Sequence, residues 1–254
     1  MFATFLFFLM LASSAFGAQY ARLVASDGQS TTAIVERVKE AKTGVILVHM
    51  LDRSAEDWSF FAEKMARAEV AVIAPDLRGH GRNAKDGQEF EEADYKAMVL
   101  DVEAAARWLK KQGVTTMSCV GASIGANLCL QAAAKDADIQ TVVMLSPGVN
   151  YKGVTSADVL GEYGARGLLL VASVEDKYSA RSAGLLEERA KGQVRFELLE
   201  NAGHGTKMLN REASLEGLVM SWVLGTHKIG GSGVGVGRPK VQLNPGKVET
   251  TGPK

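Results

Sequence analysis

A serine flanked by small residues is the strongest chemical signal in the sequence. Ser123 lies within the run 121–125 (GASIG), after an apolar segment that predicts a strand and before one that predicts a helix. In such a strand–turn–helix, Gly121 and Gly125 leave room for a sharp turn that presents the hydroxyl at the carboxyl end of the strand. The adjacent helix N-terminus favours negative charge that develops there. The motif therefore predicts that Ser123 is a nucleophile on an elbow.

The motif in this context resembles the nucleophile elbow of the α/β-hydrolase superfamily, and the resemblance extends over about residues 21–226. In that family a serine, an acid and a histidine follow in this order, each after a successive strand. The resemblance implies a Ser123, Asp176, His204 triad. It is closest to small lidless esterases and to the dienelactone-hydrolase-like and serine-aminopeptidase-like branches. Dienelactone hydrolases proper use a cysteine, so the serine argues against that chemistry.

The base and the acid implied by the resemblance both follow expected strands. His204 lies between two glycines in the loop after residues 194–199, where a neutral imidazole can take the serine proton and return it to a leaving group. The acid follows residues 167–172, where two carboxylates are adjacent. The family spacing favours Asp176, with Glu175 as the alternative. The acid accepts the second N–H of the imidazole and fixes its tautomer.

The resemblance also implies an oxyanion hole built from two backbone N–H groups. One belongs to Ile124, next to the nucleophile, and the other to Leu51 in the run His49-Met50-Leu51. Met50 stands where family members often have glycine. Trp58, a few residues on, has two interpretations: a wall of the pocket or part of the core.

The other three histidines are expected to have no catalytic role. His49 and His80 resemble family positions that shape loops, and His227 borders the C-terminal tail, where we expect solvent around it.

Apolar runs alternate with amphipathic stretches along the body of the chain. The expected strands are 21–26, 32–37, 44–50, 70–75, 116–120, 141–145, 167–172 and 194–199, and the expected helices are 58–67, 95–112, 124–135, 180–191 and 208–223. This alternation predicts an α/β fold: a mostly parallel eight-stranded sheet with helices on both faces. A Rossmann-type nucleotide-binding fold is the alternative. It is disfavoured because no GxGxxG follows the first buried strand.

The segment 146–166 has room for only one loop and one helix between two expected strands. We therefore expect no cap domain and an open cleft. Candidates for its lining are Tyr178, Met208 and Leu209.

The composition is that of a soluble globular protein, with 46% hydrophobic and 23% charged residues in 254. Lys plus Arg and Asp plus Glu are both 29, so no basic excess favours nucleic acid. The two cysteines, Cys119 and Cys129, form no zinc-ligand pattern. We expect both to be free and buried between sheet and helix, and we expect no metal or organic cofactor.

The two ends differ from the body. Residues 1–18 contain an uncharged apolar run of about 15 residues, short for a membrane span and typical of a secretory signal peptide. Residues 228–254 contain seven glycines and a basic excess, typical of a flexible tail. The expected organisation is a signal peptide (1–18), a hydrolase domain (19–227) and a tail (228–254). This predicts a secreted or periplasmic protein without stable membrane insertion after cleavage.

Together these features predict a secreted serine hydrolase that cleaves a small carboxylic ester through an acyl-enzyme. Two alternatives stay open: a peptidase or amidase with the same triad, and a non-catalytic member that binds a ligand. No oligomeric state follows from the sequence.

Overall fold

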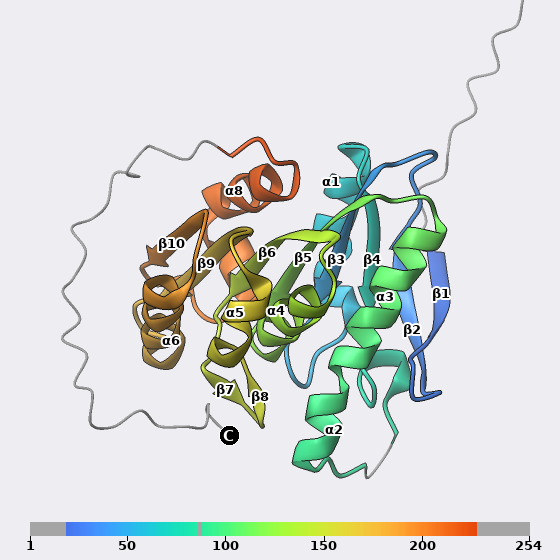
Figure 1. Ribbon diagram of the computed structural model, residues 1–254, viewed down its shortest axis with the longest axis horizontal. Coiled ribbons are helices and arrows are strands. Elements are labelled where there is room, and N and C mark those ends of the chain that lie inside the picture. Colours follow the sequence, from blue (N-terminus) through green and yellow to red (C-terminus); the bar gives the residue numbers. More distant parts are fainter. Residues whose placement is uncertain (1–18, 86–87, 228–254) are drawn as a thin grey trace, which may run out of the picture.

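The alternating apolar and amphipathic segments form a twisted sheet with helices on both faces (Figure 1). The structure is a computed structural model, which describes residues 19–85 and 88–227. The expected signal peptide (1–18) and tail (228–254) lie outside the described residues.

Within the described residues the main sheet has eight strands in the order β1-β2-β4-β3-β5-β6-β9-β10. They are β1 (Gln19–Val24), β2 (Ser30–Glu36), β3 (Thr43–Val48), β4 (Ala71–Pro75), β5 (Thr116–Ala122), β6 (Ile139–Leu145), β9 (Gly167–Ser173) and β10 (Val194–Leu199). Strand β2 runs antiparallel to β1 and β4, and the other neighbours pair in parallel. The predicted fold class is confirmed.

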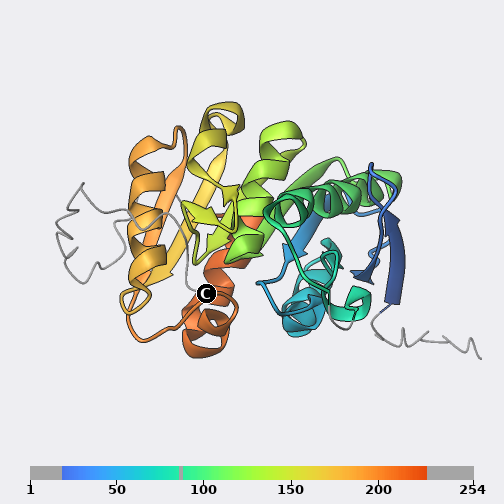
Figure 2. The same cartoon turned by 90° about the horizontal axis from the view of Figure 1, so that it is seen from below.

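Helices cover both faces of this sheet (Figure 2). On one face lie α3 (Val99–Lys111), α4 (Ile124–Lys135) and α6 (Lys177–Arg189), and on the other α1 (Ser59–Arg67) and α8 (Ala213–Val223). The sequence of β3 shows why its apolar run is continuous. Ile46 and Val48 belong to one buried cluster, whereas Val45 and Leu47 belong to the other. In β3, residues 44–48 are all buried because both faces of the strand are covered, so the hydrophobic pattern does not alternate.

Two helices that the pattern predicts as continuous are divided. The expected helix 95–112 is α2 (Glu92–Ala97) followed by α3, with a tight turn at Met98, whose N–H bonds the carbonyl three residues back. The expected helix 208–223 is α7 (Lys207–Arg211) followed by α8. Glu212 separates these two because its backbone is extended and its carboxylate caps α8 at the Ser214 N–H. Both breaks preserve the apolar spacing, which is why periodicity does not reveal them.

The segment between β6 and β9 contains a hairpin that the sequence analysis did not predict. Strands β7 (Asn150–Tyr151) and β8 (Val154–Thr155) pair across Lys152 and Gly153, which both have positive φ. A 3-10 turn, η3 (Ala157–Val159), and a short helix, α5 (Leu160–Tyr163), complete the segment. Two central residues with positive φ are typical of a tight hairpin turn. The hairpin lies at the same end of the sheet as α2 (Figure 1).

The prediction of two free cysteines is wrong, because Cys119 and Cys129 form a disulfide. Both are buried between β5 and α4, as expected, and their Cα atoms are 5.5 Å apart. The elbow turns the chain back so that the helix passes over the strand, and a pair ten residues apart comes face to face. The bond joins the strand and the helix that flank Ser123.

We predict that the protein unfolded without a reductant has no thiol to react. Iodoacetamide in guanidinium should add no mass before reduction and two carbamidomethyl groups after it, since the chain has two cysteines. Intact-mass spectrometry measures the difference. Two labelled cysteines in the unreduced sample would contradict the disulfide.

Candidate active site

Ser123 lies at a strained turn between β5 and α4. Its φ of 55° and ψ of −123° are values that non-glycine residues rarely adopt. The residue is buried, and its N–H donates to the carbonyl of Leu145 at 2.8 Å. The sequence-predicted elbow is therefore present as a backbone conformation, with the serine directly before the first residue of α4.

The two glycines of the elbow are required by close backbone contacts. A β-carbon on Gly121 would come within 3 Å of the Gly125 carbonyl, and one on Gly125 would come within 3 Å of the carbonyls of Val48 and His49. These neighbours are backbone atoms that cannot turn aside. The start of α4 is thereby packed against the end of β3.

This packing brings the loop after β3 to the N-terminus of α4. Leu51 lies three residues beyond the end of β3, and Ile124 is the first residue of α4, where backbone N–H groups have no helical acceptor. The two amides predicted to form an oxyanion hole therefore come from adjoining segments. Met50, in place of the family glycine, is buried and fills the space next to Gly205, where a β-carbon would overlap its sulfur.

His49 holds the loop after β3 from inside the protein. It is fully buried, its Nδ1 donates to the Met50 carbonyl at 2.6 Å, and its Nε2 accepts from the Leu77 N–H at 3.0 Å. One donor and one acceptor are the bonds of a neutral imidazole. Burial lowers the pKa of His49 to about 4. His80 is also buried, and its Nδ1 lies 3.0 Å from the Arg78 carbonyl.

His204 and Asp176 form a direct pair. The Nδ1 of His204 lies 2.6 Å from Oδ2 of Asp176. Asp176 also caps α6, its Oδ1 accepting from the Ser179 N–H at 3.2 Å. Burial raises the pKa of Asp176, but the hydrogen bonds with His204 and Ser179 outweigh it and hold the pKa below its ordinary value. The carboxylate is therefore charged at neutral pH.

Glu175, the alternative acid, has different partners. Its carboxylate accepts from the Ser173 hydroxyl at 2.6 Å, the Asn201 N–H at 3.0 Å and the Gly203 N–H at 2.7 Å. The hydrogen bond from Ser173, with those from the two backbone N–H groups, lowers the pKa of Glu175 against the effect of burial. Glu175 thus binds the backbone of the loop that carries His204, whereas Asp176 binds the imidazole.

Ser146 is a buried residue at this site that the sequence analysis did not identify. It follows β6 with a φ of 53°, and its hydroxyl accepts from the Gly205 N–H at 2.9 Å. It therefore fastens the far side of the His204 loop. Within the part of the chain that the structure describes, no hydrogen bond joins Ser123 to His204. Catalytic hydrogen bonds often shorten only when substrate is bound.

Several residues expected near the cleft belong to the core. Trp58 and Met208 are fully buried and Leu209 is buried, all in the cluster beneath α1 and α8. Of the two interpretations of Trp58, the structure supports the one that places it in the core. Tyr178 is half-buried and bonds the backbone of Asn150 in the hairpin.

His227, which we expected to be surrounded by solvent, instead stacks its ring on Trp222 at a centroid distance of 4.0 Å.

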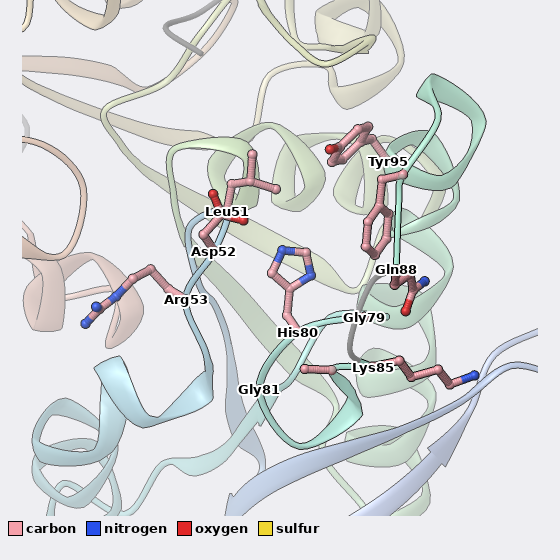
Figure 3. A pocket seen from close by; sticks show the side chains of 11 residues that line it. Leu51, Asp52, Arg53, Gly79, His80, Gly81, Lys85, Gln88 and Tyr95 are labelled. Atoms are coloured by element: carbon pink, nitrogen blue, oxygen red, sulfur yellow. The ribbon is translucent and has the colours of Figure 1, made fainter.

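A pocket of about 350 Å³ adjoins Leu51 (Figure 3). His80 lies at its centre, with Leu51 on one side and Gln88 and Tyr95 on the other. The lining residues are Leu51, Asp52, Arg53, Gly79, His80, Gly81, Ala84, Lys85, Gln88, Phe90 and Tyr95. Most of these side chains are polar or charged, with an aromatic wall from Phe90 and Tyr95, whose rings are 5.4 Å apart.

Residues 19–85 and 88–227 include no group of three or more His, Cys, Asp or Glu side chains arranged to hold a metal ion. In the same residues, no helix combines the length and the apolar character needed to cross a membrane.

A family model described as "Serine aminopeptidase, S33" matches residues 39–174, more than half of the chain. The chain belongs to this family. The match includes the elbow and the loop after β3 and ends two residues before Asp176. Membership confirms the resemblance inferred from the sequence, a serine hydrolase of the α/β-hydrolase fold.

A curated relative shares 31% identity over 113 residues: a thermostable monoacylglycerol lipase from a Bacillus species. The match spans 44% of this chain and 44% of the relative, so the chain covers less than half of that protein's length.

Solved structures match over a larger share. An esterase of Pyrococcus furiosus has a TM-score of 0.66 at 15% identity, covering 82% of this chain and 90% of its own. A dienelactone hydrolase of Anabaena variabilis has a TM-score of 0.70 at 16% identity, covering 84% and 99%. At such identities the likeness establishes the fold.

We predict that burial of neutral His49 makes the protein less stable below pH 6.5. Its pKa is about 4 when folded and about 6.5 when unfolded, so the unfolded state binds more protons between these values. The free energy of unfolding should fall by about 3 kcal/mol from pH 6.5 to 4 on this account. Nearby His80 also lowers the pKa of His49, whereas the carboxylates of Asp76 and Asp57 raise it.

Urea unfolding at several pH values measures this slope. In His49→Asn the slope between pH 4 and 6.5 should decrease, even though the variant is less stable throughout. Equal slopes in the two proteins would contradict the assignment of a buried neutral imidazole.

Proposed function

We propose that the protein is a serine hydrolase that cleaves carboxylic esters through an acyl-enzyme intermediate. The observation that carries the proposal is the 2.6 Å contact between His204 and an ionised Asp176, in the same chain as a serine in elbow geometry. In this proposal Ser123 is the nucleophile, His204 the general base and acid, and Asp176 the group that orients the imidazole. These roles require no metal or organic cofactor.

In the first step the Ser123 oxygen attacks the ester carbonyl while its proton passes to Nε2 of His204. Asp176 holds the other N–H of the ring and stabilises the imidazolium. The negative oxygen of the tetrahedral intermediate accepts from the backbone N–H groups of Leu51 and Ile124. Collapse expels the alcohol, which leaves with the proton from His204.

In the second step a water molecule replaces the alcohol. His204 takes one proton from this water, whose oxygen attacks the acyl carbonyl. The second tetrahedral intermediate collapses to a carboxylic acid and returns the proton to Ser123. Glu175 and Ser146 contribute by holding the loop on which the imidazole must keep its orientation through both steps.

We further propose that the preferred ester carries a compact polar alcohol. The pocket beside Leu51 has the volume for a small group, and its charged and amide side chains favour hydroxyl groups over a long acyl chain. The name of the curated relative, monoacylglycerol lipase, supports this proposal, because glycerol is a compact polar alcohol.

A second candidate is peptide or amide hydrolysis. The description of the matching family, serine aminopeptidase, favours it. The same residues can break an amide, but the amine needs a more complete proton transfer from His204 to leave. The ratio of activity on matched ester and anilide substrates separates the two candidates.

We also propose that the protein acts in an oxidising compartment outside the cytoplasm. The buried Cys119–Cys129 disulfide supports this, since disulfides persist in such compartments and are rare in the cytosol. The apolar run in residues 1–18 supports it independently.

We expect Ser123→Ala to abolish hydrolysis of p-nitrophenyl butyrate. Asp176→Asn should reduce kcat by on the order of 10³-fold or more, because the imidazole loses its tautomer and its charge partner. Glu175→Gln is the matched control for the alternative acid. It removes a charge from the neighbouring residue and should reduce kcat by only about tenfold, through the loop. Steady-state kinetics on all four proteins gives the ranking. A larger loss in Glu175→Gln than in Asp176→Asn would reverse the assignment of the acid.

We expect glyceryl monobutyrate to be cleaved with a kcat/KM about tenfold above that of ethyl butyrate, a preference equal to one or two hydrogen bonds. Tyr95→Phe should reduce this preference, because it removes one hydroxyl from the pocket wall. Lys135→Ala, an exposed change on α4, should leave the preference unchanged. No preference for the glyceryl ester would count against the pocket as the alcohol site.

A further inference from the structure

A buried phenol lies on the hairpin after β6, which is on the opposite side of the nucleophile strand from the loop that carries Leu51. In the sheet, β5 is flanked by β3 on one side and β6 on the other. Leu51 follows β3, whereas Tyr151 lies on the hairpin that follows β6. Figure 2 looks onto this edge of the sheet and shows the hairpin near its middle. Tyr151 is 7% exposed, so the sequence provides a polar group where the core would accept phenylalanine.

The hydroxyl of Tyr151 connects two parts of the site. It donates to the Ser146 carbonyl at 3.2 Å and lies 3.1 Å from the Ser179 hydroxyl. Because the carbonyl can only accept, the phenol proton is directed to Ser146, and Ser179 donates to the phenol oxygen. The N–H of Ser179 in turn donates to Asp176.

Both partners of the phenol hold parts of the proposed triad: the Ser146 hydroxyl accepts from the Gly205 N–H in the His204 loop, and the Ser179 N–H donates to Asp176. Burial raises the pKa of Tyr151 far above its ordinary value, with a contribution from the charge on Asp176. The hydroxyls of Ser179 and Ser123 act in the opposite direction and lower this pKa. The phenol is therefore neutral at any working pH.

The surroundings of Tyr151 leave its ring little freedom. Tyr178 packs edge-on at a centroid distance of 5.4 Å, and Gly148 lies so close that a β-carbon there would meet the ring. The buried amide of Asn127 donates to the carbonyls of Gly148 and Val154 at 2.8 Å each, which fixes both ends of the hairpin to α4. A side chain held this firmly can orient its neighbours.

We propose that Tyr151 is a positioning residue for the Asp176–His204 pair: its phenol bonds Ser146, which holds the His204 loop, and Ser179, which holds the turn that carries Asp176. The proposal rests on the proposed function of Ser123. It assigns to the hairpin β7–β8 a role in the chemistry, in addition to covering the core.

The test uses Tyr151→Phe, which keeps the ring and removes the hydroxyl. Tyr163→Phe is the matched control, because Tyr163 is also a buried phenol that donates to a carbonyl, that of Gly167, but lies outside the site. The readouts are kcat and KM on p-nitrophenyl butyrate and the rate of labelling by a fluorophosphonate. In labelling, the Ser123 oxygen bonds to phosphorus, fluoride leaves, and the serine proton goes to His204.

Tyr151→Phe should lower both kcat and the labelling rate about tenfold with KM within about twofold, the loss expected when one hydrogen bond that orients the reacting pair is removed. Tyr163→Phe should lose comparable stability in urea and label at the wild-type rate.

Wild-type labelling of Tyr151→Phe, with Ser123 identified as the labelled residue, would overturn the positioning role and leave the proposed function intact. Failure of the wild-type protein to label at Ser123 would overturn both.

Discussion

Helix α4 begins so close to the end of β3 that Gly125 has no room for a β-carbon, and the proposed active site depends on this contact. At the same turn Gly121 has no room for a β-carbon, because the backbone of Gly125 lies against it, and Ser123 between them has a strained backbone. The contact between α4 and β3 brings the loop of Leu51 to the first N–H groups of the helix. A strained residue persists only where its surroundings determine its conformation. Here the surroundings are backbone atoms on both sides and a disulfide that joins the flanking strand and helix.

Polar side chains at the ends of strands hold the loops that surround this contact. His49 fixes the loop after β3, Glu175 binds the near side of the His204 loop, and Ser146 binds the far side. Each lies at or just beyond the carboxyl end of a strand and bonds backbone groups of a loop. The bonds of His49 and Ser146 are buried, where a hydrogen bond is costly to leave unmade, and the charged Glu175 binds two backbone N–H groups at once. These contacts restrict each loop to one conformation. The imidazole of His204 is thereby directed at Asp176 by the rigidity of its loop.

The elements that the sequence predicted well are those whose signal is local. The apolar run of β3 and the glycines of the elbow each follow from steric and burial rules that involve neighbouring residues. The divisions at Met98 and Glu212 were missed because a turn that preserves apolar spacing leaves no mark on periodicity. The hairpin at Tyr151 was missed because its strands are two residues long, although the Lys152-Gly153 pair is a turn signal.

The sequence by itself determined the fold class, the elbow and the order of Ser123, Asp176 and His204 along the chain, because each depends on a strand and the residues just after it. Only the tertiary structure decided that Asp176 contacts the imidazole while Glu175 binds backbone, that the cysteines are bonded, and that a buried phenol joins Ser146 to Ser179. Each of these contacts joins segments that are far apart in the chain, or, for the cysteines, segments that the elbow folds against each other. Such contacts are set by how the strands pack side by side, which no local pattern encodes.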